Sequence, residues 1–301
     1  MTLEVNFIKK FGDDFSKNVK LSNYSWFNLG GNAEFFYKAK DKDQLIDFLR
    51  YAKEKKLRTT ILGAGSNTLF RDNGVKGAVI KLGKFFSYTK LADKEILEAG
   101  AATLDRQVAN YAQENNLGNL EFLSCIPGSI GGAVIMNSGC YNNDISKVLI
   151  SIKAIDRNTF SEIEIKKENI NFSYRGTNLS EDLIITSAKF KGLPGDKERI
   201  KKKQLDLIER KKLTQPSQVK TCGSTFKNIN KDKKAWMLIK ESGCDRFYEG
   251  DATISQKHCN FFVNNGNAKS SDIENLIQKV KKKVSEKTGI NLELEIKIVG
   301  E

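Results

Sequence analysis

The fold is decided by the stretch Ile126-Pro127-Gly128-Ser129-Ile130-Gly131-Gly132-Ala133-Val134, which runs on to Met136-Asn137-Ser138-Gly139. Residues 128–139 hold four of the chain's 23 glycines in twelve residues, next to one of only three prolines. Glycine tolerates positive φ and lets a ligand approach the backbone closely, and bare amides can form a concave nest for an anion. A tight loop between core elements would explain the same residues, so the stretch alone leaves both interpretations open.

A second glycine stretch, Leu62-Gly63-Ala64-Gly65-Ser66-Asn67, follows a short apolar strand predicted at Thr59–Leu62. A strand at 33–39 and a helix that Asp41 can cap precede it, which makes a βαβ unit. Open α/β sheets often place ligands where such strands end. Neither stretch holds the lysine of a P-loop, and Thr68 stands where a dinucleotide motif needs its third glycine. The two stretches favour a pyrophosphate held by backbone amides alone.

The other segments show the periods of strands and helices. We expect strands at Ala78–Leu82 and Glu95–Ala99, a helix capped by Thr103 and closed by Gly118, and antiparallel strands at Leu149–Asp156, Ser161–Ile165 and Leu183–Phe190. The turn Gly192–Gly195 predicts a domain boundary, and a helix at Asp196–Lys212 leads into a last domain. In that domain we expect helices at Asp232–Glu241 and from Ser270, a strand around His258–Val263 and a period-2 strand at Leu292–Ile298.

The composition describes a soluble globular protein of 301 residues, with 39% hydrophobic and 29% charged residues. No apolar run approaches the roughly 20 residues that cross a bilayer. Charges interrupt residues 1–20, so we expect no signal peptide, no membrane partner and a cytoplasmic location. The net charge of +13 would suit a nucleic-acid surface. Because lysines lie among glutamates at 197–212 and 279–287, as on solvated faces, we expect no nucleic acid and an anionic small substrate instead.

Cysteine and histidine usage argues against a metal site. The five cysteines are widely spaced without a C-x-x-C pair, and His258 is the single histidine. Zinc sites usually draw on closely spaced pairs of cysteines or histidines, and this chain has neither. We therefore expect reduced thiols and no metal.

Three runs carry polar groups that could act on a substrate. Arg175 offers a guanidinium fork that fits a carboxylate, although it could be an ordinary surface arginine. The run Cys222–Asn228 puts a serine, a lysine and an amide after a glycine, and a turn before a strand would explain it nearly as well. Glu293, Glu295 and Lys297 share one face of the last predicted strand, and such faces are usually solvated. A single histidine, with no recognisable order of serine and acid partners around it, is weak evidence for a Ser-His-acid triad.

Together these runs resemble the family of UDP-N-acetylenolpyruvoylglucosamine reductases (MurB), flavoenzymes of bacterial cell-wall precursor synthesis, from about Leu21 to Gly300. Seven motifs come in family order: Asn23–Gly31, Gly63–Asn67, Ile126–Ala133 with Met136–Gly139, Tyr174-Arg175, Gly223–Asn228, Ser255–His258, and Leu292-x-x-Glu295-Ile296-x-x-x-Gly300. The chain departs from the family pattern at Ser25, Asn28, Ile229 and Cys244–Asp251. It is similar to the short type II form, because the last domain shows no tyrosine-bearing insertion.

The resemblance implies an α+β protein with an FAD-binding fold of the vanillyl-alcohol-oxidase/PCMH type. Two α/β subdomains would lie at 1–80 and 81–195, and a C-terminal α+β substrate-binding domain at 196–301, whose final residues could return to the first subdomain. The implied cofactor is non-covalent FAD, with NADPH as co-substrate, and we expect a monomer. The residues implied to bind FAD are Gly63, Ala64, Gly65, Ser66, Asn67, Pro127, Gly128, Ser129, Gly131, Gly132, Ala133, Asn137 and Gly139.

The implied reaction reduces the enolpyruvyl group of UDP-N-acetylglucosamine enolpyruvate to give UDP-N-acetylmuramate. Hydride reaches the β-carbon, and negative charge appears at the α-carbon and the carboxylate. Arg175, assisted by Glu295, would stabilise that charge, and Ser224 would give its hydroxyl proton to the α-carbon. The implied substrate contacts are Tyr174, Lys227, Asn228, Lys257 and His258.

Two other interpretations stay open. One is another FAD-dependent oxidase or dehydrogenase of the same fold, many of which hold FAD covalently through a histidine. The other is a basic nucleic-acid-binding protein whose glycine loops are structural. Flavin absorption would separate the last from the two enzymes, and NADPH oxidation that depends on the enolpyruvyl sugar would separate the enzymes from each other.

Overall fold

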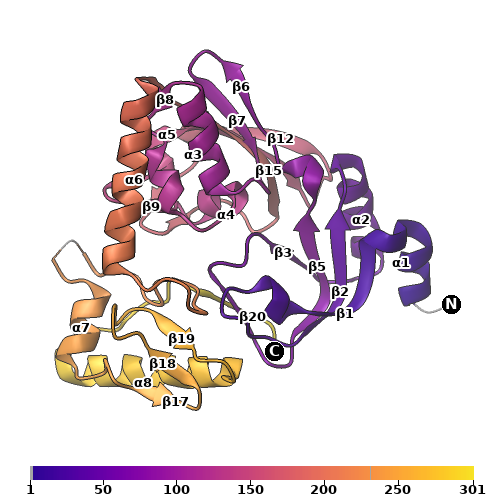
Figure 1. The fold of residues 1–301 in the computed structure, drawn as a ribbon. Coiled ribbons are helices and arrows are strands. Elements are labelled where there is room, and N and C mark those ends of the chain that lie inside the picture. Colours follow the sequence, from indigo (N-terminus) through magenta and orange to yellow (C-terminus); the bar gives the residue numbers. More distant parts are fainter. Residues whose placement is uncertain (1–2, 231) are drawn as a thin grey trace. The chain divides into compact units, whose positions relative to one another are not determined.

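The computed structural model describes residues 3–230 and 232–301 (Figure 1). Contacts between residues divide the chain into two compact units. Unit 1 holds Met1–Ser16, Phe35–Ala64 and Gly77–Lys211, and unit 2 holds Lys17–Glu34, Gly65–Lys76 and Lys212–Glu301. The three-part division by ligand stays a prediction, because contacts alone do not say what each part binds.

A four-stranded sheet in the order β1-β2-β5-β3, most of whose residues belong to unit 1, organises the first part of the chain. Its elements are α1 (Leu3–Phe11), β1 (Phe15–Lys20), β2 (Asn32–Ala39), α2 (Lys42–Glu54), β3 (Thr59–Leu62) and β5 (Val75–Leu82). As predicted, Asp41 caps α2, since its carboxylate accepts from the Gln44 amide at 2.8 Å. Leu62 of β3 lies opposite Lys81 of the parallel strand β5, so Gly63 leaves the sheet directly after a strand end.

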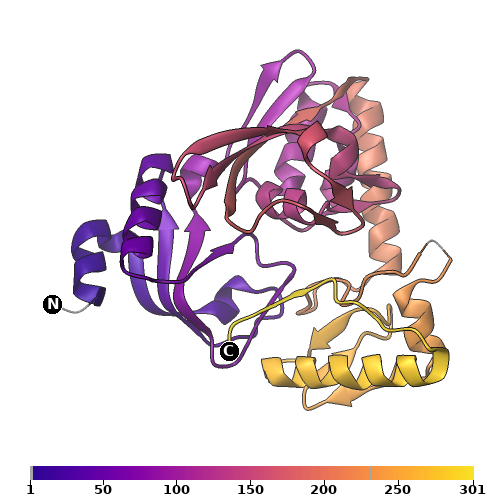
Figure 2. The same cartoon turned by 180° about the vertical axis from the view of Figure 1, so that it is seen from behind.

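The second half of unit 1 is built on a five-stranded antiparallel sheet in the order β12-β11-β15-β7-β6. Its larger elements are β6 (Thr89–Asp93), β7 (Ile96–Gly100), α3 (Asp105–Glu114), α4 (Ile130–Ile135), β11 (Leu149–Asp156), β12 (Glu162–Lys166), β15 (Leu183–Lys191) and α6 (Lys197–Thr214). The antiparallel strands predicted at 149–190 are confirmed. Figure 1 shows α3 and α4 over one face of this sheet, and Figure 2 shows the sheet from its other side. Apolar side chains of the two helices and of β7, β11 and β15 share one core.

Short elements connect this sheet with its helices. They are β8 (Leu117–Gly118), η4 (Glu121–Cys125), β9 (Gly139–Cys140), β10 (Asn143–Asp144), α5 (Ile145–Val148), β13 (Phe172–Ser173), β14 (Gly176–Thr177) and β16 (Leu193–Pro194). Two sequence predictions about α3 fail here. Thr103 does not cap α3, because its hydroxyl donates to the Tyr88 carbonyl at 2.8 Å, and α3 ends at Glu114 rather than at Gly118. Within the turn Gly192–Gly195, Leu193–Pro194 forms β16 and pairs with β8, and unit 1 runs on to Lys211.

Unit 2 packs α7 (Ala235–Glu241) and α8 (Ser270–Thr288) with a three-stranded antiparallel sheet of β17 (Tyr248–Glu249), β18 (Ala252–Ile254) and β19 (Phe262–Asn264). The periodicity of α8 correctly predicts its buried face, which is Ile273, Leu276, Ile277, Val280 and Val284. The predicted last strand is shorter than expected: only β20 (Lys297–Val299) pairs in a ladder, parallel to β4 (Thr68–Phe70). No helix in residues 3–230 and 232–301 has the length and apolar character needed to span a membrane.

Candidate functional site

In unit 1, the end of β3 meets the long glycine stretch. A Cβ added to Gly63 would lie 3.1 Å from the Ser129 hydroxyl, so the Ser129 side chain lies close to the Gly63 backbone. The Lys81 ammonium donates to the Gly63 carbonyl at 2.8 Å and holds this peptide in place. Burial, with the neighbouring Lys38, lowers the pKa of Lys81. Sequence reasoning missed Lys81, since a lysine that ends a strand gives no signal of its own.

The glycine stretch is packed tightly on one side and open on the other. The Gly131 amide donates to the Ala101 carbonyl at 2.9 Å, and a Cβ on Gly131 would lie 3.2 Å from the Ala101 methyl. A Cβ on Gly132, by contrast, would meet no atom of the described residues within 4 Å outside its chain neighbours and the backbone of α4. A ligand could therefore contact bare backbone at Gly132, which is the property expected of a cofactor cradle.

Asp105 lies directly beneath this stretch and is fully buried. A Cβ on Gly128 would lie 2.6 Å from its Oδ2, so only glycine fits there without a shift. Among the described residues, neither carboxylate oxygen of Asp105 has a hydrogen-bond partner. Burial therefore raises the pKa of Asp105 well above its ordinary value. No pattern in the sequence signals this residue, because acids in the first turn of a helix are common on surfaces.

Asp105→Asn is expected to remove a pH-dependent loss of stability. Because the folded pKa is raised, the native state holds a proton that the unfolded state loses, so the stabilisation present at low pH disappears as pH rises through the folded pKa. Between acidic and neutral pH, the melting temperature of the variant should rise relative to that of the wild type by roughly 2–4 °C, which corresponds to about 1 kcal/mol in the free energy of unfolding. Circular dichroism melts across pH would measure this, with Asp43→Asn in the exposed first turn of α2 as control. Melting temperatures that change in parallel would contradict the expectation.

Arg175 is placed in unit 1 by a hairpin with a two-residue loop. Ser173 of β13 pairs with Gly176 of β14, and Arg175 has a left-handed backbone with φ of 60°. Its Nη2 donates to the Gly139 carbonyl at 3.1 Å, and its guanidinium lies 5.0 Å from the centre of the Tyr174 ring. The guanidinium is thus held against the last residue of the glycine stretch.

Asn137 joins the same hairpin to the glycine stretch. It is buried, and its side-chain amide donates to the Ser173 carbonyl at 3.0 Å while its Oδ1 accepts from the Ser146 amide at 3.0 Å. These bonds give Asn137 a structural role in holding Arg175 in position, beside the cofactor contact implied by the resemblance.

In unit 2, the backbone brings Ser224 and Glu295 onto neighbouring segments. Ser224 forms an isolated antiparallel bridge with Phe261, and the Thr225 amide donates to the Asn260 carbonyl at 2.8 Å. The Glu295 amide donates to the Thr225 carbonyl, also at 2.8 Å. Two candidates that are far apart in the sequence therefore lie side by side in unit 2.

The second half of the shorter glycine stretch joins these residues in unit 2. The Asn67 side chain donates to the Glu295 carbonyl at 3.0 Å, and the Asn67 carbonyl accepts from the Lys297 amide at 2.9 Å. Gly65 has φ of 70°, and a Cβ there would lie 1.7 Å from the Tyr24 carbonyl oxygen. Gly65–Asn67 is thus fixed between the opening motif and the segment that carries Glu295.

The proposed substrate contacts of unit 2 are held by local bonds. The Asn228 Oδ1 accepts from the Ala235 amide at 3.1 Å, at the start of α7. Lys227 forms an ion pair with Glu293 at 3.6 Å, and the Lys257 ammonium donates to the Lys212 carbonyl. These contacts leave the assignments to substrate as predictions.

His258 supports the segment next to Ser224. Its Nδ1 accepts from the Asn260 amide at 3.3 Å, and its ring packs edge-on against Phe261 with centroids 4.9 Å apart. Burial lowers the pKa of His258, which keeps it neutral near pH 7. The histidine thus orders the residues that pair with Ser224 and Thr225, a role that sequence alone does not indicate.

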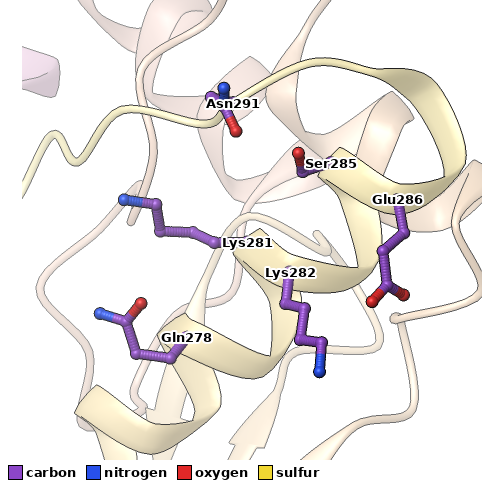
Figure 3. Close-up of a pocket in the computed structure, with 6 residues that line it drawn as sticks. All are labelled: Gln278, Lys281, Lys282, Ser285, Glu286 and Asn291. Atoms are coloured by element: carbon purple, nitrogen blue, oxygen red, sulfur yellow. The ribbon is translucent and has the colours of Figure 1, made fainter.

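An open groove of about 360 Å³ runs along the last turns of α8 (Figure 3). Its lining residues are Gln278, Lys281, Lys282, Ser285, Glu286 and Asn291, none of which is a candidate from the sequence. The carboxyl end of a helix disfavours anions, so this groove is a poor phosphate site in spite of its two lysines. Within the described residues, no cluster of three or more histidine, cysteine or acidic side chains could hold a metal ion.

Comparisons with known proteins agree with this arrangement. A family model described as UDP-N-acetylenolpyruvoylglucosamine reductase, C-terminal domain, matches residues 215–299, and one described as FAD binding domain matches residues 33–159. The UDP-N-acetylenolpyruvoylglucosamine reductase of Pelagibacter ubique (strain HTCC1062) is 45% identical over 99% of this chain and 100% of its own length. That of Orientia tsutsugamushi (strain Ikeda) is 43% identical over 97% of each chain.

A solved structure is similar over nearly the same range. The crystal structure of UDP-N-acetylenolpyruvylglucosamine reductase from Thermus caldophilus has a TM-score of 0.80 and 30% sequence identity, and covers 94% of this chain and 98% of its own. This similarity and the match at residues 33–159 confirm the predicted α+β fold with its FAD-binding part.

Proposed function

This chain belongs to the family of UDP-N-acetylenolpyruvoylglucosamine reductases, and from that premise we propose that it reduces the enolpyruvyl group of UDP-N-acetylglucosamine enolpyruvate with NADPH. The product is UDP-N-acetylmuramate, a peptidoglycan precursor, and the enzyme acts as a monomer in the cytoplasm. The observation that carries the proposal is the backbone bond from Glu295 to Thr225, which sets Glu295 beside Ser224.

The proposed FAD contacts are the glycine stretches of each unit. In unit 1 they are Gly63, Ala64 and the residues named above in 127–139, and in unit 2 they are Gly65–Asn67. The close approach of Gly63 to Ser129 and the open side of Gly132 fit a cofactor that lies against bare backbone. When bound, FAD supplies the redox chemistry, accepting hydride from NADPH and passing it to the β-carbon of the substrate.

The proposed catalytic residues stabilise negative charge on the substrate and donate a proton to it. Arg175 binds the substrate carboxylate and stabilises the negative charge that develops there, and its bond to the Gly139 carbonyl orients the guanidinium. Ser224 transfers its hydroxyl proton to the α-carbon. Glu295, beside Ser224, assists in stabilising the same charge. Hydride and proton add across the double bond, so no group leaves the substrate.

Two half-reactions followed by flavin absorbance test the proposal. Anaerobic NADPH should bleach the flavin, and UDP-N-acetylglucosamine enolpyruvate should then restore its colour. UDP-N-acetylglucosamine, which lacks the enolpyruvyl group, is the matched control and should not restore it. A purified protein without bound or reconstitutable flavin, or one reoxidised equally by both sugars, would refute the proposal.

Lys81→Met is expected to weaken FAD binding about tenfold, because the charge-assisted bond to the Gly63 carbonyl contributes about 1.5–3 kcal/mol. Ultrafiltration of the reconstituted protein at several FAD concentrations would measure the dissociation constant. Lys84→Met, which removes an exposed lysine three positions away, should bind FAD as the wild type does. Unchanged affinity in both variants would show that the Gly63 peptide needs no such anchor.

A further inference from the structure

Two cysteines bracket the long glycine stretch. Cys125 ends η4, directly before Ile126-Pro127, and Cys140 belongs to β9, directly after Gly139. β9 lies against η4, where the Cys140 thiol donates to the Phe122 carbonyl at 3.3 Å, and each of the two cysteines shifts the pKa of the other. The fold therefore brings together two cysteines that lie at the two ends of the long glycine stretch, one of the two stretches proposed above to bind FAD.

The surroundings of this pair favour a thiolate at Cys125. The Lys211 ammonium donates to the Cys125 carbonyl at 2.6 Å, and the Ser124 hydroxyl lies 3.8 Å from the Cys125 sulfur. The neighbouring Cys140 thiol, with smaller contributions from Ser124 and Lys211, lowers the pKa of Cys125 to about 7. Interaction with Cys125, together with burial, raises the pKa of Cys140, so Cys140 keeps its proton, which it donates to the Phe122 carbonyl.

The other cysteines have a different environment. Burial raises the pKa of both Cys222 and Cys244 to about 11 and also raises the pKa of Cys259. These three lie in the apolar core of unit 2. They serve as internal controls, since buried cysteines in apolar surroundings are inert.

We propose that Cys125 and Cys140 form a redox-sensitive dithiol that a hydroperoxide converts into a disulfide. The Cys125 thiolate attacks a peroxide oxygen and the O–O bond breaks; the leaving hydroxide takes up a proton as water, and Cys125 becomes a sulfenic acid. The Cys140 sulfur then attacks the Cys125 sulfur, the S–O bond breaks, and the departing hydroxide leaves as water with the Cys140 proton. Two thiols and one H₂O₂ thus give one disulfide and two waters: the sulfurs lose two electrons and the peroxide gains two.

Because the two cysteines are largely buried, only a small oxidant can reach them. Cys125 is 6% exposed, whereas Cys140 is partly exposed. Hydrogen peroxide is small enough to reach such a thiolate, and a bulky disulfide reagent is not. The new bond would tie together the two ends of the glycine stretch beside the Gly139 carbonyl, which accepts from Arg175.

Graded hydrogen peroxide applied to the reduced, FAD-loaded protein tests the proposal. Remaining thiols are blocked with iodoacetamide after unfolding, and digested peptides are mapped by mass spectrometry. We expect a peptide cross-linked through Cys125 and Cys140, lost again on reduction, to form at least about tenfold faster than Cys244 or Cys259 is oxidised. Oxidation of those core cysteines at an equal rate, or loss of thiols without this cross-link, would overturn the proposal.

Single variants assign the two roles. In Cys140→Ser, Cys125 should stop at the sulfenic acid and be labelled by dimedone, whereas in Cys125→Ser, Cys140 should stay a thiol. Cys259→Ser is the matched control and should form the cross-link at the wild-type rate. Dimedone labelling at Cys140 rather than Cys125 would reverse the assignment, and the wild-type cross-link decides the proposal if a variant fails to fold.

Discussion

Ser224→Ala is expected to slow reoxidation of the reduced flavin by the enolpyruvyl sugar about 10²–10⁴-fold, the usual contribution of a positioned general acid. Reduction of the flavin by NADPH should keep its wild-type rate, because that step needs no proton at the substrate α-carbon. Anaerobic stopped-flow absorbance would measure each half-reaction separately. The isolated bridge to Phe261 is made by backbone atoms and stays intact in the variant, so the change removes only the hydroxyl.

Thr225→Val is the matched control for this variant. Thr225 is fully buried, and its Oγ1 has no hydrogen-bond partner among the described residues. Replacing it with an isosteric apolar side chain removes a hydroxyl one position from Ser224 without removing a bond. This variant should keep both half-reactions. Wild-type reoxidation in Ser224→Ala would exclude Ser224 as the proton donor, whatever the control does.

Elements whose neighbours repeat their own periodicity were predictable from the sequence. β11 begins and ends where the alternation of Leu149–Asp156 predicts, because both of its neighbours in the sheet continue the same two-residue period. The buried face of α8 and the cap at Asp41 follow equally local rules. For such elements, tertiary packing reinforces the local pattern.

Elements whose hydrogen bonds go to distant partners were not predictable in the same way. The segment Leu292–Ile298 has a two-residue period, but the backbone of its first half bonds to isolated partners such as Thr225. Only its end forms a ladder with another strand. Threonine is a common helix cap, but the Thr103 hydroxyl donates its hydrogen bond to the Tyr88 carbonyl instead. A local pattern reports a preference, and the partner that competes for it lies elsewhere in the chain.

The residues of the candidate site likewise fall into contiguous motifs, which the sequence reveals, and residues that act through distant contacts, which it does not. The motifs Gly63–Asn67, Ile126–Ala133 and Gly223–Asn228 are contiguous, so sequence alone located them. Lys81 and Asp105 hold or underlie the glycine stretch through contacts that cross the fold, and neither belongs to a motif. Residues that support a site are therefore harder to find from sequence than residues that would touch its ligand.

Arg175→Lys is expected to lower the rate of flavin reoxidation by the enolpyruvyl sugar by at least about 10²-fold, in the range found when one preorganised donor to a developing charge is lost. A guanidinium can donate to the Gly139 carbonyl and still present a planar pair of N–H groups to a carboxylate, whereas an ammonium is a single, strongly hydrated point charge. Stopped-flow absorbance would again separate the half-reactions, and reduction by NADPH should be unaffected.

The control and a rescue experiment separate the shape of the guanidinium from its charge. Arg106→Lys, on the exposed side of α3, should behave as the wild type does. In Arg175→Ala, added guanidinium ions at millimolar concentration should restore part of the reoxidation rate, and methylammonium should restore less, because only the former reproduces the planar fork. Equal rescue by both cations, or wild-type turnover in Arg175→Lys, would mean that positive charge beside Gly139 is sufficient and that the fork is not required.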